Sequence, residues 1–165
     1  MTTPTFAQVF AGVVDGPDYG KIREIIDAMV PFNNHVGVRI TEVGPEAGIV
    51  EIPAGKNMLN HLGTVHAGAL YLAGEVAGAA AFCGAFAPKL AELGGFILRD
   101  SRILFRKPAN GVITARATLD PATVAEVLTG SVTGKFDLDG KAVLHDENGV
   151  QVAKMYLDYA CFFAE

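Results

Sequence analysis

This chain has little of what marks several large functional classes. It contains no tryptophan, only two cysteines and a formal net charge of −5, with 13 Lys and Arg against 18 Asp and Glu. The acidic balance argues against a nucleic-acid partner, because phosphate backbones attract basic surfaces. Cys83 and Cys161 have no partner-like spacing, so we expect both to be buried, reduced thiols of a cytoplasmic protein.

We find no targeting signal and no internal repeat in the sequence. The first ten residues, MTTPTFAQVF, have neither a basic segment nor a long apolar one, so we expect no signal peptide and a cytoplasmic location. No internal repeat or low-complexity tail is evident. At 165 residues the chain predicts a single domain, 1–165, in which 1–31 form N-terminal helices and 32–165 form the core.

One apolar run, residues 60–88, dominates the middle of the chain. After two histidines it stays apolar for more than twenty positions, and Glu75 is its only charged side chain. A helix that is apolar on all faces is either a membrane span or the core helix of a domain. The run is long enough to cross a bilayer, and Gly74 and Gly78 have the spacing of membrane-helix contacts. However, Glu75 lies near its centre and no Lys/Arg cluster or tryptophan flanks it, so we expect a core helix and no membrane partner.

The N-terminal thirty residues predict two short helices. Apolar residues recur at helical spacing over 6–14, and a second stripe covers 22–30 after Asp18, which can cap a helix that Pro31 ends. We interpret both stripes as packing surfaces. A lid over the sheet or over a substrate channel is the alternative.

From Val36 onward the hydrophobic period changes to two, which is typical of strands. One short helix is predicted after Asp120 and Pro121, to about Val132. The predicted strands cover 36–43, 49–53, 96–107, 112–119, 141–145 and 150–163. Since the long helix and the strands must each bury an apolar face, we predict an α+β fold in which an antiparallel sheet wraps around the one long helix.

A polar motif precedes the long helix. It reads Asn60-x-x-Gly63-x-x-His66-x-Gly68, and Glu75 follows nine residues after the histidine. This pattern resembles the hot-dog-fold acyl-CoA thioesterases of the PaaI-like type. The chain departs from that family at Ala67, where glycine is usual, and at Glu75, where aspartate is frequent.

Two later segments carry the same resemblance. Residues 101–111, SRILFRKPANG, are similar to the family's strand and turn after the helix, and residues 146–153, DENGVQVA, to its closing segment. The resemblance therefore covers roughly residues 31–163. The N-terminal helices and the extra helix near Asp120 resemble a less characterised branch, known only as a domain of unknown function.

The resemblance implies a hot-dog fold and an acyl-CoA thioesterase that acts on a coenzyme A thioester without a cofactor. It also implies a homodimer with its sites at the subunit interface, and it leaves open whether dimers pair into a homotetramer. The residues allow either an aryl or an aliphatic acyl group of small or medium size.

Elementary chemistry supports this interpretation of the motif. Thioester hydrolysis needs donors for the developing oxyanion and a base or nucleophile for the attack. The helix N-terminus would supply the N–H groups of Ala67 and Gly68, whose small side chains let the carbonyl approach. Glu75, with its pKa raised by the apolar helix around it, would activate a water or attack directly.

The other motif residues have two interpretations each. Asn60 would orient a water or bond the substrate carbonyl, or else cap the turn before the helix. His66 would donate to the substrate or lock the loop. His61 and Gly63 are candidate substrate contacts, although a structural role is favoured for His61. His61, His66 and Glu75 fit no familiar metal-ligand spacing, so no metal site is predicted.

Basic side chains gather on and after one predicted strand. Arg106 and Lys107 are candidates for binding the phosphates of coenzyme A, and Arg99 and Arg102 lie nearby in the chain. A solvated strand face is the alternative interpretation.

The spacing of the motif has a geometric consequence. Ala67 and Glu75 are eight residues apart, which is about 12 Å along one helix axis. One carbonyl cannot contact both residues of a single subunit. Two protomers with antiparallel helices side by side would bring Glu75 of one beside Ala67 of the other. We therefore predict an obligate dimer with two composite sites, whose edge strands pair across the two-fold axis.

Two other functions stay open. His61 precedes Glu75 by fourteen residues, which is similar to the His/Glu pair of hydroxyacyl-thioester dehydratases, although the Pro-Gly that usually precedes their acid is absent. The other is a dimer that binds acyl-CoA or acyl chains without turnover, which Ala67 in place of glycine favours.

Overall fold

The computed structural model describes residues 4–13 and 16–164. Its helices are α1 (Phe6–Val9), α2 (Tyr19–Met29), α3 (Pro31–Val36), α4 (Ala67–Ala85) and α5 (Pro121–Leu128). Its strands are β1 (Arg39–Val43), β2 (Gly48–Ile52), β3 (Leu93–Phe105), β4 (Ile113–Leu119), β5 (Lys135–Asp146) and β6 (Gln151–Phe163). Short 3-10 turns cover Ala11–Val13, Lys56–Met58 and Ala87–Glu92.

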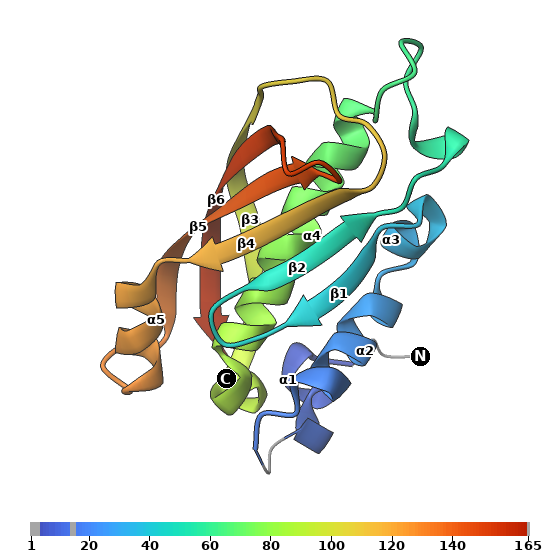
Figure 1. The fold of residues 1–165 in the computed structure, drawn as a ribbon. Helices are drawn as coiled ribbons and strands as arrows, with labels where there is room; N and C mark the ends of the chain where they lie inside the picture. The colour runs from blue at the N-terminus through green and yellow to red at the C-terminus, as the bar shows by residue number, and fades with distance from the viewer. Residues whose placement is uncertain (1–3, 14–15, 165) are drawn as a thin grey trace.

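The strands form one six-stranded sheet in the order β1-β2-β4-β5-β6-β3, and every neighbouring pair is antiparallel. Figure 1 shows the sheet curving around α4, with α1 and α2 on one side of the molecule and α5 on the other. This arrangement confirms the predicted hot-dog fold, in which the apolar helix and the apolar face of the sheet bury each other.

Small side chains let α4 lie close to the sheet. A Cβ atom on Gly48 of β2 would lie 2.6 Å from the Ala77 carbonyl oxygen and 2.6 Å from the Ala80 Cβ, which is closer than atoms pack in a protein interior. The many Ala and Gly residues of α4 are therefore explained by packing against strands.

The position of α4 inside the fold argues against the membrane-span alternative. By length and hydropathy α4 could cross a bilayer, yet 67% of its apolar window is buried inside the fold. The sheet covers the apolar surface that lipid would cover in a membrane span. A mostly buried position is what is expected of a core helix that is apolar all round.

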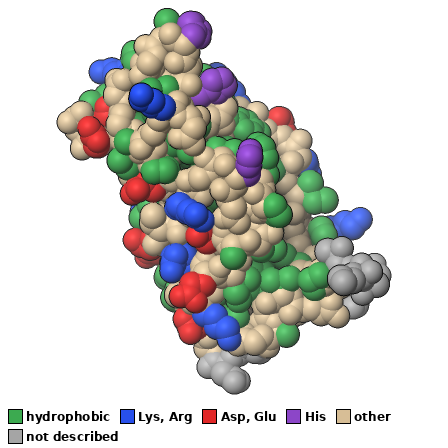
Figure 2. Space-filling model, turned by 90° about the vertical axis from the view of Figure 1, so that its right-hand side faces the viewer, with side chains coloured by type: hydrophobic (Ala, Val, Ile, Leu, Met, Phe, Trp, Pro, Cys, Tyr) green, Lys and Arg blue, Asp and Glu red, His purple; other side chains and the backbone are tan. Residues whose placement is uncertain are grey.

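One edge of the sheet is covered by the chain itself. In α2, the Asp27 carboxylate accepts a hydrogen bond from the Ile40 N–H of β1 at 2.8 Å, and Arg23 donates to the Ile40 carbonyl at 3.4 Å. These bonds occupy backbone groups of an edge strand that another chain could otherwise pair with. Seen from this side, Lys and Arg side chains are interspersed with Asp and Glu (Figure 2).

The N-terminal segment packs against the C-terminal half of α4. The Phe6 ring of α1 lies 4.9 Å from that of Phe10, 6.3 Å from Phe82 of α4 and 6.0 Å from Phe96 of β3, measured between centroids. Tilted and edge-on contacts of this kind stabilise an aromatic cluster. The stripe over 6–14 is thus a packing surface as far as Val13, and Val14 lies outside the described residues.

The predicted strand over 36–43 is confirmed as β1, but its predicted start at Val36 was wrong. Pro31 does not simply end the second helix, because it is the first residue of α3, where a proline has no N–H to lose. The left-handed Gly37, with φ of 93°, ends α3, and β1 begins only at Arg39. The helical part of the chain therefore continues past residue 31 to Val36.

Two strand boundaries also differ from the prediction. Gly94 and Gly95 were expected in a turn, but they lie inside β3, where the pairing register shifts between Leu93 and Gly95. A bulge accommodates glycines that would otherwise mark a turn. β5 begins at Lys135 instead of Lys141, and its first residues alternate in burial as a strand does.

Other local predictions are confirmed. Asp18 and Asp120 cap α2 and α5 by accepting hydrogen bonds from Lys21 N–H and Thr123 N–H. Both cysteines are free and buried.

Candidate active site

The N-terminus of α4 is capped by His66. Its backbone is extended, with φ of −63° and ψ of 138°, and its Nδ1 accepts a hydrogen bond from the Gly68 N–H at 2.8 Å. Because Nδ1 accepts, a neutral His66 carries its proton on Nε2, which is then free to donate. A Cβ on Gly68 would lie 3.0 Å from Nδ1, so glycine leaves room for the imidazole to fold over the helix end.

This cap changes which backbone groups could bind an oxyanion. The Gly68 N–H, which we predicted as a donor, is already bonded to His66. The Ala67 N–H forms no hydrogen bond with any described residue. The open donors at this helix end are therefore the Ala67 N–H and the His66 Nε2–H, and both belong to exposed residues.

Asn60 shapes the loop before the helix. Its Oδ1 accepts hydrogen bonds from the N–H groups of Leu62 at 2.9 Å and Thr64 at 3.2 Å, and its Nδ2 donates to the Thr64 hydroxyl at 2.9 Å. Gly63 has a left-handed φ of 76°, which completes the turn. Of the two interpretations of Asn60, the turn cap is the one that these contacts match, and its role toward a substrate stays a prediction. His61 is exposed in the same loop.

The same loop is joined to the segment after β3. The Val65 N–H donates to the Ala109 carbonyl at 2.8 Å. Arg106 and Lys107, which precede Ala109 by only a few residues, are exposed and form no ion pair within the described part of the chain. The fold thus brings these two cations to the same end of the molecule as the His66 cap.

Arg99, in contrast, has partners in the sheet. It forms ion pairs with Asp137 at 2.8 Å and Asp158 at 2.9 Å, and these carboxylates raise the pKa of its guanidinium. Its charge is therefore balanced by acids of the neighbouring strands. The solvated-strand interpretation fits Arg99 better than it fits Arg106 and Lys107.

Glu75 lies in the third turn of α4 and is half-buried. Burial raises the pKa of its carboxyl above the ordinary value, and the carboxyl makes no hydrogen bond or ion pair with a described residue. Glu75 and the Ala67 N–H remain about 12 Å apart along the helix, so one chain does not bring them to a single carbonyl.

Two tyrosines near Glu75 were missed by the sequence reasoning. Tyr71 lies one turn before it on α4 and shares a 2.7 Å hydrogen bond with Ser101 of β3. The spacing of Tyr71 could have identified it as a neighbour of Glu75. Tyr159 of β6 is buried against α4, and only the folded sheet brings it there.

The β3 edge of the sheet is open in the single chain. β3 pairs with β6 and with no other described strand. Its side chains include Ile97 and Phe105, which are 60% and 51% exposed although both are large and apolar. An unpaired edge with exposed apolar side chains is a surface suited to another strand.

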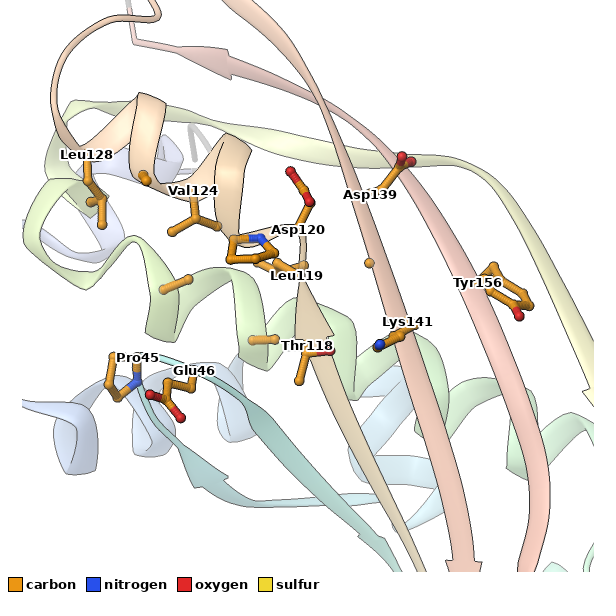
Figure 3. A pocket seen from close by; sticks show the side chains of 15 residues that line it. Pro45, Glu46, Thr118, Leu119, Asp120, Val124, Leu128, Asp139, Lys141 and Tyr156 are labelled. Carbon is orange, nitrogen blue, oxygen red and sulfur yellow. The ribbon is translucent and has the colours of Figure 1, made fainter.

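A cavity lies in another part of the fold. It has a volume of about 770 Å³ and lies between α5, the turn from β1 to β2, and the C-terminal half of α4 (Figure 3). Its lining includes Ala81 and Ala85 of α4, and its charged residues are the acids Glu46, Asp120 and Asp139 and one cation, Lys141. None of the predicted site residues lines it. The three carboxylates disfavour the phosphates of coenzyme A there.

Ala81 is also removed from Glu75. They are six positions apart in α4, which is about 9 Å along the axis and about a third of a turn around it. We therefore place the candidate site at the N-terminal half of α4 and not in this cavity. Among the described residues, no group of three His, Cys, Asp or Glu side chains is arranged to hold a metal ion.

A family model described as "Domain of unknown function (DUF4442)" matches residues 21–159. The chain belongs to the DUF4442 family. The matched residues include the motif at the start of α4, Glu75 and α5. A search among curated proteins found no match for this DUF4442 chain.

Several of the solved structures similar to the DUF4442 chain are described as thioesterases or as related to the thioesterase superfamily. A Pseudomonas aeruginosa protein of unknown function, described as a probable thioesterase, is 27% identical, with a TM-score of 0.69 over 88% of this chain and 95% of its own. The PaaI protein of the E. coli phenylacetic acid degradation operon is 16% identical, with a TM-score of 0.64 over 87% and 92%. A Chlorobaculum tepidum protein of unknown function is 17% identical, with a TM-score of 0.74 over 96% of each chain.

These likenesses confirm the resemblance inferred from the motif. At identities below about a quarter, the PaaI and Chlorobaculum structures establish the hot-dog fold and nothing finer. The family match confirms the expected branch, a domain of unknown function.

Proposed function

We propose that this DUF4442 protein hydrolyses a small or medium acyl- or aryl-CoA thioester in sites that two protomers share. The observation that carries the proposal is Glu75, a half-buried carboxyl with a raised pKa and no partner among the described residues, on the same apolar helix whose N-terminus offers open donors. Groups perturbed in this way gather at functional sites. The thioesterase-superfamily fold supports the same activity.

A dimer resolves the distance between the two groups. If a second copy pairs along the open β3 edge, two α4 helices lie antiparallel beside each other. Glu75 of one protomer then faces the Ala67 N–H of the partner subunit. The pairing would also cover the exposed Ile97 and Phe105 side chains and satisfy the edge strand. A further pairing of dimers into tetramers is compatible with this arrangement.

Hydrolysis follows from these positions. Glu75 takes a proton from a water whose oxygen attacks the thioester carbonyl. The oxyanion that forms accepts hydrogen bonds from the Ala67 N–H and the His66 Nε2–H. The carbon–sulfur bond then breaks, the proton passes from Glu75 to the departing thiolate, and a carboxylic acid and free coenzyme A result. No cofactor is needed for these steps.

Glu75 could also act as the nucleophile. Its carboxylate would then attack the carbonyl and expel the thiolate, leaving a mixed anhydride that water opens. The two routes differ in where the oxygen of solvent appears. Hydrolysis in ¹⁸O-water labels only the product acid in the first route, and in the second it also labels Glu75 when water attacks the protein side of the anhydride.

Arg106 and Lys107 support a coenzyme A substrate. They are exposed, unpaired with acids of the described chain, and joined through the Val65–Ala109 hydrogen bond to the loop that carries His66. Cations in such a place attract the phosphates of the nucleotide portion.

A non-catalytic acyl-CoA binder is the second candidate. It is favoured by one observation, which is that His66 occupies the Gly68 N–H and so leaves a single backbone donor at the helix end. Fewer donors mean weaker stabilisation of an oxyanion.

Turnover and binding of acyl-CoA separate the two candidates. We expect the wild-type protein to release free thiol from at least one member of a panel of acetyl-, butyryl-, octanoyl-, benzoyl- and phenylacetyl-CoA. Thiol release by the protein would exclude the binder. Binding without thiol release, measured by calorimetry with the same panel, would contradict the thioesterase.

A further inference from the structure

The Tyr159 hydroxyl is a buried polar group without a partner. Tyr159 is 1% exposed, and its hydroxyl is the one buried side-chain polar atom in the described chain that makes no hydrogen bond. A buried donor that makes no bond is costly, so each such group in a folded protein requires a physical explanation.

The ring alone does not explain why this residue is a tyrosine. Tyr159 packs edge-on against Phe96, with 5.5 Å between the ring centroids, and Phe96 in turn stacks on Phe82 at 4.1 Å. Phenylalanine would make the same ring contacts in this cluster without burying a hydroxyl. The hydroxyl must therefore be retained for something other than packing.

At the position of the hydroxyl, α4 has a glycine and no side chain. A Cβ on Gly78 would collide with the Tyr159 oxygen, so the absence of a side chain at Gly78 makes the space that the hydroxyl fills. Gly78 is three residues after Glu75, and side chains at that spacing emerge about 5–6 Å apart on one face of a helix. The hydroxyl thus lies beside the base of the Glu75 side chain and deeper in the fold.

Glu75 and Tyr159 are complementary. In the described part of the chain, Glu75 is an acceptor without a partner and Tyr159 is a donor without one. Burial and the neighbouring Glu75 raise the pKa of Tyr159, so the phenol keeps its proton and remains a donor. The other titratable groups near the hydroxyl are Cys83, Cys161 and Tyr71, and none of them is a cation that could hold the carboxylate instead.

We propose that Tyr159 is a positioning residue for Glu75: its hydroxyl donates a hydrogen bond to the Glu75 carboxylate and fixes the orientation in which that carboxylate meets the substrate. The bond forms by rotation of the Glu75 side chain, because the Tyr159 hydroxyl packs against Gly78 on the face of α4 from which Glu75 emerges. The inference rests on the proposed function, and it names a group that acts through Glu75 without touching the substrate.

The substitution Tyr159→Phe tests this directly, because it removes only the hydroxyl. We expect kcat to fall on the order of ten- to a hundredfold with KM nearly unchanged, since a hydrogen bond to a charged group is lost. The melting temperature should fall only slightly, because one hydrogen bond is lost while the half-buried Glu75 carboxylate can bond to water instead. Tyr19→Phe in α2 makes the same chemical change far from Glu75 and should leave kcat unchanged.

The pKa of Glu75, followed by carbon NMR with labelled glutamate, is a second readout that does not depend on activity. Donation to the carboxylate favours its charged form, so Tyr159→Phe should raise this pKa by about one unit or more. Glu75→Gln assigns the resonance.

The two ideas fail in different ways. If the wild type hydrolyses no thioester but the Glu75 pKa rises in Tyr159→Phe, the proposed function fails and the positioning role stands. If the wild type is active and Tyr159→Phe keeps both kcat and the Glu75 pKa, the positioning role is overturned. A large fall in melting temperature would also overturn it, since the hydroxyl would then stabilise the fold beyond its bond to Glu75.

Discussion

The two halves of α4 share a composition but differ in environment. In the C-terminal half every residue over 80–85 is buried, and the Phe6 ring closes that end. In the N-terminal half Ala67, Gly68 and Tyr71 are exposed and Glu75 is half-buried. The difference arises because α1 covers one end of the helix, while the other end faces the open β3 edge. An Ala- and Gly-rich helix can thus form the core at one end and a site at the other. The degree of burial distinguishes the two ends.

The largest effect is expected from Glu75→Gln, which keeps the shape of the side chain. We predict that kcat falls by about 10²–10⁴-fold, the usual contribution of a general base, while the fold is retained. Thiol release and circular dichroism on the same samples check both parts. Activity near that of the wild type would mean that Glu75 has a structural role and not a catalytic one.

The pH dependence gives a matched check on Glu75. As a base it must be ionised, so kcat/KM of the wild type should fall as pH is lowered through its raised pKa. The free energy of unfolding should change with pH in the opposite direction to kcat/KM. A carboxyl whose pKa is higher in the folded state than in the unfolded state stabilises the fold fully below its unfolded pKa, and this contribution is lost as pH rises through the folded pKa. Glu75→Gln should remove that slope and be the more stable protein at neutral pH.

The C-terminal half should respond in the opposite way. Phe82→Ala deletes a fully buried ring, and we expect about 3–5 kcal/mol of lost unfolding free energy. Urea unfolding measures this loss, and kcat per folded molecule should change far less than in Glu75→Gln. Phe32→Ala, at a position 62% exposed, is the control and should cost less than about 0.5 kcal/mol. Equal losses in the two variants would mean that burial does not distinguish them.

The smallest effect is expected at the polar end, from Arg106→Ala. Loss of one exposed cation should raise KM for an acyl-CoA a few-fold, which is about 0.2–1 kcal/mol, and the difference from the wild type should shrink at high salt. Arg116→Ala removes an exposed arginine of β4 and serves as the matched control. A KM that is equally changed in both variants would argue for general charge and against a phosphate contact at Arg106.

Much of the fold could be predicted because its signals are local. The apolar run with one acid predicts α4, and Asp18 and Asp120 cap helices through bonds to residues three positions away. Errors occurred where two signals compete. Pro31 is a helix stop by one rule and a helix start by another, and Gly94 marks either a turn or a bulge.

The finer parts of the site depend on contacts that no local pattern encodes. The Gly68 N–H belongs to an anion site in an ideal helix, but the rotamer of His66 decides whether it is free. Tyr159 reaches α4 only through the pairing of β5, β6 and β3, so its place beside Glu75 follows from the folded sheet. The residues of the motif were predictable, and the hydrogen bonds between them were not.

The most direct test of a shared site is complementation between two inactive variants. Glu75→Gln removes the base. Ala67→Pro removes the backbone donor at the first helical position, where proline is tolerated and the extended His66 suits a residue before proline. Each variant alone should be inactive.

Thiol release should return when the two variants are co-expressed in equal amounts. Half of the dimers would then be mixed, and each mixed dimer would hold one intact site of two, so about a quarter of wild-type activity is expected. Sedimentation equilibrium on the same sample confirms that dimers form. Mixed dimers without activity would contradict a site built from Glu75 of one protomer and Ala67 of the other.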